Sequence, residues 1–118
     1  MAITLEQQRA ADAWKQSKDK GKDYVNLAKG LSALIINSGL LSVLAFLHQK
    51  GAHSEMLGNQ LRTWLSVRFP KLKNTSFETF MGGLLNSTSM EYQQITAEAH
   101  AWLRWMRQMA AANNAKGE

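Results

Sequence analysis

The side chains that could do catalytic chemistry are few in this sequence, and they do not stand at catalytic spacings. The 118 residues include no cysteine, which excludes a catalytic thiol, cysteine-ligated zinc and an iron–sulfur cluster. The three histidines, His48, His53 and His100, have no carboxylates near them at metal-ligand spacing, so no metal site is expected. Glu91 and Glu98 are a heptad apart on one predicted helix, an arrangement that gives poor support to a paired-carboxylate hydrolase.

Phosphate-loop and nucleophile patterns are missing as well. Gly82 and Gly83 lack the lysine and the preceding strand of a phosphate-binding loop. No serine stands in a nucleophile-elbow pattern. The sequence therefore predicts a protein that is not an enzyme and that carries no catalytic residue, metal or cofactor.

Positive charge is the chemical signal that remains. The formal net charge is +5, which favours polyanionic partners. Residues 1–30, 31–75 and 76–118 carry about +2, +4 and −1, so the excess lies in the first two-thirds of the chain. The first eight residues have neither the basic nor the apolar region of a secretory signal, and together with the absence of cysteine this favours the cytoplasm.

The elements that must position these charges are helices. Helical spacing recurs throughout the chain and convincing strand-like alternation does not, so we expect an all-α fold, a compact single-domain bundle of five to six helices. Capping-box patterns begin at Thr4, Thr75 and Thr88, each just ahead of an apolar run. The expected helices cover about residues 5–17, 23–37, 40–50, 56–68, 76–85 and 89–112. Residues 1–112 form the expected domain and residues 113–118 a frayed tail.

The uncharged segment over residues 31–47 is the one candidate for a membrane span. Its 17 residues are near the lower limit for crossing a bilayer, and Asn37, Ser38 and Gly39 would expose polar backbone to lipid at its centre. We therefore predict a buried helical hairpin with a break at Gly39, in a soluble protein.

The last predicted helix has a sorted surface. At 100° per residue, His100, Arg104 and Arg107 share one flank, while Glu98 and Trp105 share the other. A basic flank beside an exposed tryptophan is typical of a helix with two partners. A solvated face with one surface aromatic has the same pattern, and the sequence leaves both interpretations open.

The junction between the first two helices is also basic. It has four lysines in eight residues, interrupted by Asp19: Lys15, Lys18, Lys20 and Lys22. Such a cluster either follows a phosphate backbone or only solubilises a helix end. Trp14, Trp64 and Phe46 all fall at core spacing, so no aromatic platform for bases is predicted and any nucleic-acid contact should be to phosphates, independent of sequence.

Several segments, in order along most of the chain, resemble one family. The segment QQRAADAW (residues 7–14) resembles the opening helix of the small all-helical subunit of the Cmr-type (type III-B) CRISPR effector complex. The segment LIINSGLL (residues 34–41) resembles the central hairpin of that family. YQQITAEA (residues 92–99), followed by WLRWMR (residues 102–107), resembles its closing helix. The sequence departs from the family pattern at Ser32, where proline is expected, and at Ser38, which separates Asn37 from the glycine; both positions affect only the hairpin.

The resemblance implies a function. In this family several copies of the small subunit stack as a minor filament beside backbone subunits that hold the guide RNA, and target RNA pairs with the guide in the channel between them. Cleavage and signalling belong to other subunits. The implied partners are guide RNA, target RNA, other copies of this chain, and the backbone and large subunits, in antiviral defence.

Placing the polar side chains on these helices gives candidate site residues. Those expected to face RNA are Arg9, Lys15, Lys18, Lys22, Lys50, Arg104 and Arg107. Glu98 and Trp105 are the candidates for a contact between copies. Two other functions stay open: a free-standing helical nucleic-acid-binding regulator, and a structural adaptor that binds protein alone. The helix after Gly39 is too apolar for a recognition helix, which disfavours the regulator.

Overall fold

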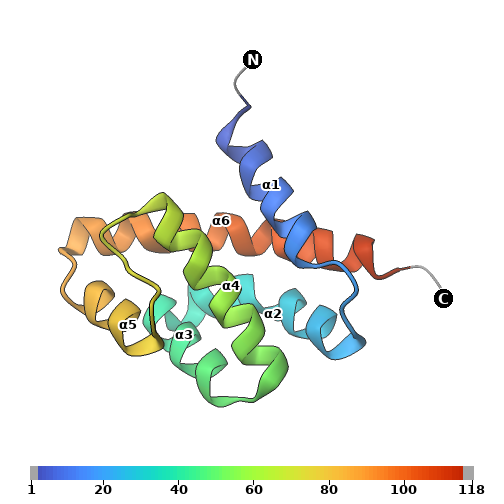
Figure 1. The fold of residues 1–118 in the computed structure, drawn as a ribbon, viewed down its shortest axis with the longest axis horizontal. Coiled ribbons are helices and arrows are strands. Elements are labelled where there is room, and N and C mark those ends of the chain that lie inside the picture. The colour runs from blue at the N-terminus through green and yellow to red at the C-terminus, as the bar shows by residue number, and fades with distance from the viewer. Residues whose placement is uncertain (1–2, 116–118) are drawn as a thin grey trace.

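The predicted helices all form within residues 3–115, the part of the chain that the computed structural model describes (Figure 1). The order is α1 (Leu5–Gln16), α2 (Lys22–Ser38), α3 (Leu40–Gln49), α4 (Ala52–Arg68), α5 (Phe77–Leu85) and α6 (Ser89–Asn113). No strand occurs among residues 3–115, and the all-α prediction is confirmed.

Two helix starts differ from the predicted ones. Helix α4 begins at Ala52, one turn before the expected start, because Gly51 with φ +119° separates it from α3 directly. The N-cap of α5 is Ser76, whose hydroxyl accepts a hydrogen bond from the Thr79 amide. The capping box expected to begin at Thr75 is therefore wrong, because the cap of this helix lies one residue later. The capping boxes at Thr4 and Thr88 are confirmed.

The longest helix, α6, is the scaffold against which α1, α2 and α4 pack. It buries one apolar side, which includes Ile95, Leu103 and Met106. Trp102 is fully buried there, and its Nε1 donates a 2.8 Å hydrogen bond to Asp12 of α1. Trp14 was expected in the core but is 42% exposed, because α1 packs mainly on α6 and its far side is left uncovered.

The apolar segment over residues 31–47 forms the predicted buried hairpin of α2 and α3. The break falls at Gly39, whose φ of +86° favours glycine. Across the break, the Leu41 amide donates a 3.2 Å hydrogen bond to the hydroxyl of Tyr92, so α6 supplies a partner to the start of α3. Among residues 3–115, no helix is long and apolar enough to cross a membrane.

The end of α6 is tied to the end of α1. The Asn113 side chain donates to the carbonyl of Trp14 (2.7 Å), and Asn114 donates to that of Ser17 (2.9 Å) while accepting from the Lys20 amide (2.9 Å). The prediction of a frayed tail is therefore wrong for Asn113 and Asn114, because their amides fill the orphan backbone groups at the end of α1. Residues 116–118 lie outside the described range.

Candidate nucleic-acid interface

Most of the predicted RNA-facing cations lie around one end of the molecule. There α1 ends, α2 begins and α6 ends beside them, as Figure 1 shows. We call this region, together with Arg104 at its border beside Glu6 and Arg9 of α1, the basic end. It is defined by six exposed side chains: Lys15, Lys18, Lys22, Lys50, Arg104 and Arg107. Hydrogen bonds that Asn113 and Asn114 make with the α1–α2 junction fix its shape.

Lys50 joins this region from another helix. It is the C-cap of α3 and lies across an open hollow of about 380 Å³ from Asp23 and Asn26 at the start of α2. Its ammonium also lies 5.5 Å from the centre of the Phe46 ring. The fold thereby adds a cation distant in sequence to the lysines of the α1–α2 junction.

The cations of the basic end are free to bind an external anion. Among residues 3–115, none of the six has a carboxylate oxygen within 4.0 Å. Lys71, in contrast, pairs with Glu91 at 2.7 Å. Unpaired cations at an exposed surface are what a phosphate backbone would meet, because each neutralised phosphate releases counterions.

Arg9 is partly exposed beside Arg104, but its guanidinium forms an ion pair within the chain. Its Nε and Nη2 each donate a 2.7 Å hydrogen bond to the carboxylate of Glu98. The same carboxylate accepts from Nε1 of Trp64 (2.9 Å), and Arg68 lies 3.8 Å away. Arg9 therefore reaches the surface with its charge already compensated, and the prediction that Glu98 shares an exposed flank with Trp105 is wrong, because Glu98 is only 6% exposed.

The surroundings of Glu98 keep it ionised. Burial alone would raise the pKa of this carboxyl, but the hydrogen bonds from Arg9 and Trp64 and the charges of Arg9 and Arg68 outweigh it and lower the pKa. The pKa of Glu55 is lowered in the same way: burial raises it, and Arg62 and His48 more than compensate. Both carboxylates thus hold helices together as anions: Glu98 joins α1, α4 and α6, and Glu55 joins α3 to α4.

These lowered pKa values predict a loss of stability in acid. A glutamate whose folded pKa lies below its ordinary value of 4.5 stabilises the fold fully above that pH, and the contribution disappears as pH falls through the folded pKa. Melting temperatures measured from pH 7 to pH 3 should fall below about pH 5. A Glu98→Gln variant should show a shallower fall, and an identical pH profile for the two proteins would contradict this role for Glu98.

Trp105 borders a groove between α1 and α6. The groove has a volume of about 640 Å³ and is lined by Glu6, Arg9, Ala101, Arg104, Trp105 and Gln108. The indole is half-buried and packs on the core from one side, so its other side is available in the groove. Glu98 lies beneath this surface, where it positions α1 through Arg9.

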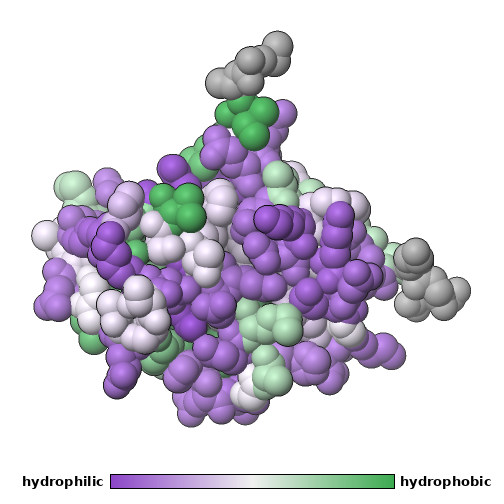
Figure 2. Space-filling model, in the orientation of Figure 1, coloured by the Kyte–Doolittle hydropathy of each residue, from purple (hydrophilic) through white to green (hydrophobic). Residues whose placement is uncertain are grey.

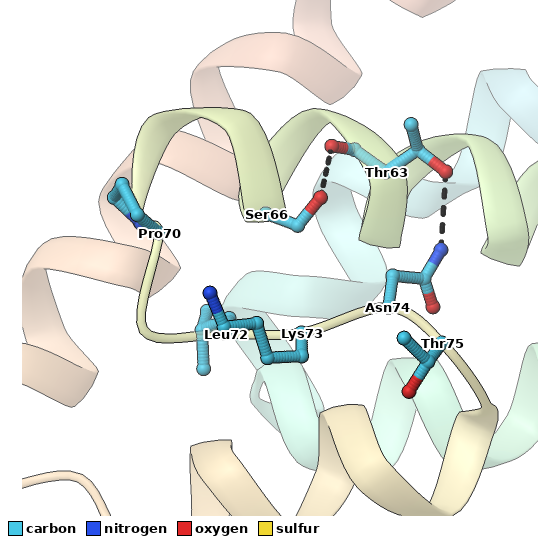
Figure 3. A pocket seen from close by; sticks show the side chains of 7 residues that line it. All are labelled: Thr63, Ser66, Pro70, Leu72, Lys73, Asn74 and Thr75. Carbon is cyan, nitrogen blue, oxygen red and sulfur yellow. Dashed lines mark hydrogen bonds between the residues drawn. The ribbon is translucent and has the colours of Figure 1, made fainter.

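A second hollow, of about 340 Å³, lies between α4 and the loop over residues 69–76 (Figure 3). Its polar groups are occupied by local bonds: Asn74 donates to the hydroxyl of Thr63 (3.1 Å), and Ser66 donates to the carbonyl of Thr63 (2.7 Å). Lys73 lies at its edge. Nothing in this arrangement pairs a nucleophile with a base. Among residues 3–115, no cluster of histidine, aspartate and glutamate side chains could hold a metal ion.

One exposed cation on α2, Lys29, was not predicted from the sequence as a candidate site residue. Lys29 lies on the solvent side of α2 and, among residues 3–115, makes no ion pair within 4.0 Å. It stands seven residues after Lys22, and this spacing places two side chains on nearly the same helix face. That spacing was the signal that could have identified it.

The chain is similar to known proteins in sequence and in fold. A family model described as CRISPR-associated protein (Cas_Cmr5) matches residues 5–113. The crystal structure of a CRISPR-associated Cmr5 family protein from Thermus thermophilus superposes with a TM-score of 0.79 at 24% sequence identity, over 96% of this chain and 99% of that one. No curated protein matches the sequence. The structural similarity shows the fold, and the family match covers nearly the whole chain.

Proposed function

The chain belongs to the Cas_Cmr5 family and is a small subunit of a Cmr-type (type III-B) CRISPR complex, and from this premise we propose that it holds RNA in that complex. Several copies stack as a minor filament. Each copy contacts the paired guide and target RNA through phosphates, independently of sequence. The subunit is not a catalyst; it works in the cytoplasm, in antiviral defence, together with the backbone and large subunits.

The observation that carries this proposal is the set of unpaired cations at the basic end. Each copy offers only a few phosphate contacts, and a few contacts alone bind weakly at physiological salt. Repetition along a filament raises the overall affinity, because every further contact is made at high effective concentration. We assign the RNA-facing role to Lys15, Lys18, Lys22, Lys50, Arg104 and Arg107, with a smaller contribution from Arg9 because Glu98 compensates its charge.

The contact between copies is assigned to the surface around Trp105. A half-buried tryptophan at the edge of a groove offers a large apolar contact at a small cost in conformational entropy, as is common at protein interfaces. Glu98 supports this surface from below and does not itself reach the neighbouring copy.

The burial of α3 disfavours the regulator. The helix that follows the Gly39 break buries Leu40, Val43, Leu44 and Leu47, so it presents no polar row to a DNA groove. A structural adaptor that binds no RNA is separated from the proposed function by the salt dependence of binding.

A double substitution at the α1–α2 junction tests the proposal. With Lys18→Gln and Lys22→Gln, the assembled complex should bind target RNA less tightly, by a similar factor for two unrelated guide–target pairs. Affinity falls as salt rises, and this fall should become shallower in the variant. The magnitude of the slope of log affinity against log salt should be smaller by about 0.7–0.9 for each phosphate that a copy no longer neutralises. Lys71→Gln with Lys73→Gln is the matched control, because it removes the same two charges from exposed positions away from the basic end. An unchanged slope in the double variant would support the adaptor instead.

A further inference from the structure

The first turn of α1 projects from the body of the molecule. Figure 1 shows this helix rising away from α6, and Figure 2 shows a hydrophobic tip on an otherwise mostly hydrophilic face. We call residues 3–8 the N-terminal arm. Ile3 is 55% exposed at its start, and Glu6 is its only charged residue. No side chain among residues 3–115 covers this projecting apolar residue.

An apolar hollow lies on another side of the molecule, between the end of α2 and the first half of α6. Its volume is about 370 Å³, and it is lined by Ile35, Ile36, Tyr92, Gln93, Thr96, Ala97 and His100. We call it the Ile36 hollow, because Ile36 is 70% exposed at its edge. A water molecule occupies about 30 Å³ in the liquid, so the hollow has room for an aliphatic side chain.

We propose that the N-terminal arm of one copy docks in the Ile36 hollow of the next copy. The inference rests on the proposed stacking and names the surfaces that make it. Ile3 enters the hollow beside Ile36, so that two exposed apolar side chains leave water together.

Charge favours this occupant. His100 lines the hollow, and Arg104 and Arg107 continue from it along the basic flank of α6, whereas the arm carries a single negative charge at Glu6. Among residues 3–115, Glu6 has no cation within 4.0 Å.

The two surfaces are placed for head-to-tail assembly. Glu6 of the arm and Trp105 line one groove, so the arm and the Trp105 surface are neighbours. Thr96 precedes Trp105 by nine residues on α6, and at 100° per residue this places the two side chains on opposite flanks. A contact that joins opposite, unlike surfaces leaves one of each free at every step, so it continues from copy to copy, as a filament requires, and does not form a symmetric pair.

Disulfide trapping tests this contact directly, because the chain has no cysteine of its own. The complex is assembled with a chain carrying both Ile3→Cys and Ile36→Cys, and is then oxidised. Denaturing electrophoresis should show a ladder of covalent dimers, trimers and longer species, and mass spectrometry should place the bond between positions 3 and 36. The matched control carries Ile3→Cys with Val67→Cys, because Val67 is 68% exposed, close to the 70% of Ile36. It should give no ladder.

Three results would overturn the inference. Equal ladders from the two cysteine pairs would mean non-specific encounters at the arm. No ladder in a complex that native mass spectrometry shows to hold several copies would mean that copies stack through other surfaces, and the proposed function would survive. A complex with a single copy would contradict the proposed stacking together with the inference.

Discussion

Replacing Glu98 with alanine is expected to lower the free energy of unfolding by about 3 kcal/mol. The substitution removes the acceptor of two hydrogen bonds from Arg9 and one from Trp64, so a guanidinium and an indole N–H lose their partner at a largely buried position. For a domain of this size the melting temperature should fall by about 10 °C. Thermal denaturation followed by circular dichroism measures the change.

Two further variants separate the ion pair from general effects of the substitution. Glu78→Ala removes an exposed glutamate that, among residues 3–115, makes no ion pair, and it should change stability by about 0.5 kcal/mol or less. Arg9→Met with Glu98→Leu replaces the pair by apolar side chains and should be more stable than Glu98→Ala alone, because no uncompensated charge remains. A melting temperature of Glu98→Ala within about 2 °C of the parent protein would show that Glu98 does not hold α1 in place.

Reversing the charges of Arg104 and Arg107 is expected to weaken target-RNA binding by the assembled complex at least about tenfold at near-physiological salt. Each copy would no longer neutralise two phosphates and would place two carboxylates against the RNA backbone, and the effect is repeated along the filament. Because the two side chains are exposed, Arg104→Glu with Arg107→Glu should leave the melting temperature of the isolated chain nearly unchanged.

The matched control for net charge is Lys71→Glu with Lys73→Glu. It makes the same change in charge in the loop before α5, away from the basic end. RNA affinity should change much less in this variant. Equal losses of affinity in the two double variants would mean that the RNA responds to overall charge only, and an unchanged affinity in the arginine variant would remove Arg104 and Arg107 from the interface.

Local signals in the sequence were sufficient for most of the fold. Capping residues and the glycines at 39 and 51 mark where helices begin and end, since each acts through its own backbone and side-chain chemistry. The fully buried Trp102 and Leu103 follow from helical spacing on α6 alone. These features need no knowledge of which helix packs on which.

The errors arise where a neighbouring helix determines whether a side chain is buried and which partner it has. Spacing on α6 places Glu98 on a polar flank, but α1 and α4 cover that flank and supply Arg9 and Trp64 as partners. Trp14 is the reverse case, an apolar position that no neighbouring helix covers fully. The position of Lys50 beside the start of α2 likewise depends on how the α2–α3 hairpin folds back. A single helix carries no information about the neighbour that crosses it.

Native affinity purification of the tagged chain from its source cells tests the central proposal most directly, provided that bound protein and bound RNA are both identified. We expect a large ribonucleoprotein that contains short guide RNAs, backbone subunits and several copies of this chain. Recovery of the chain alone, or bound to DNA, or in a protein assembly without RNA, would contradict it.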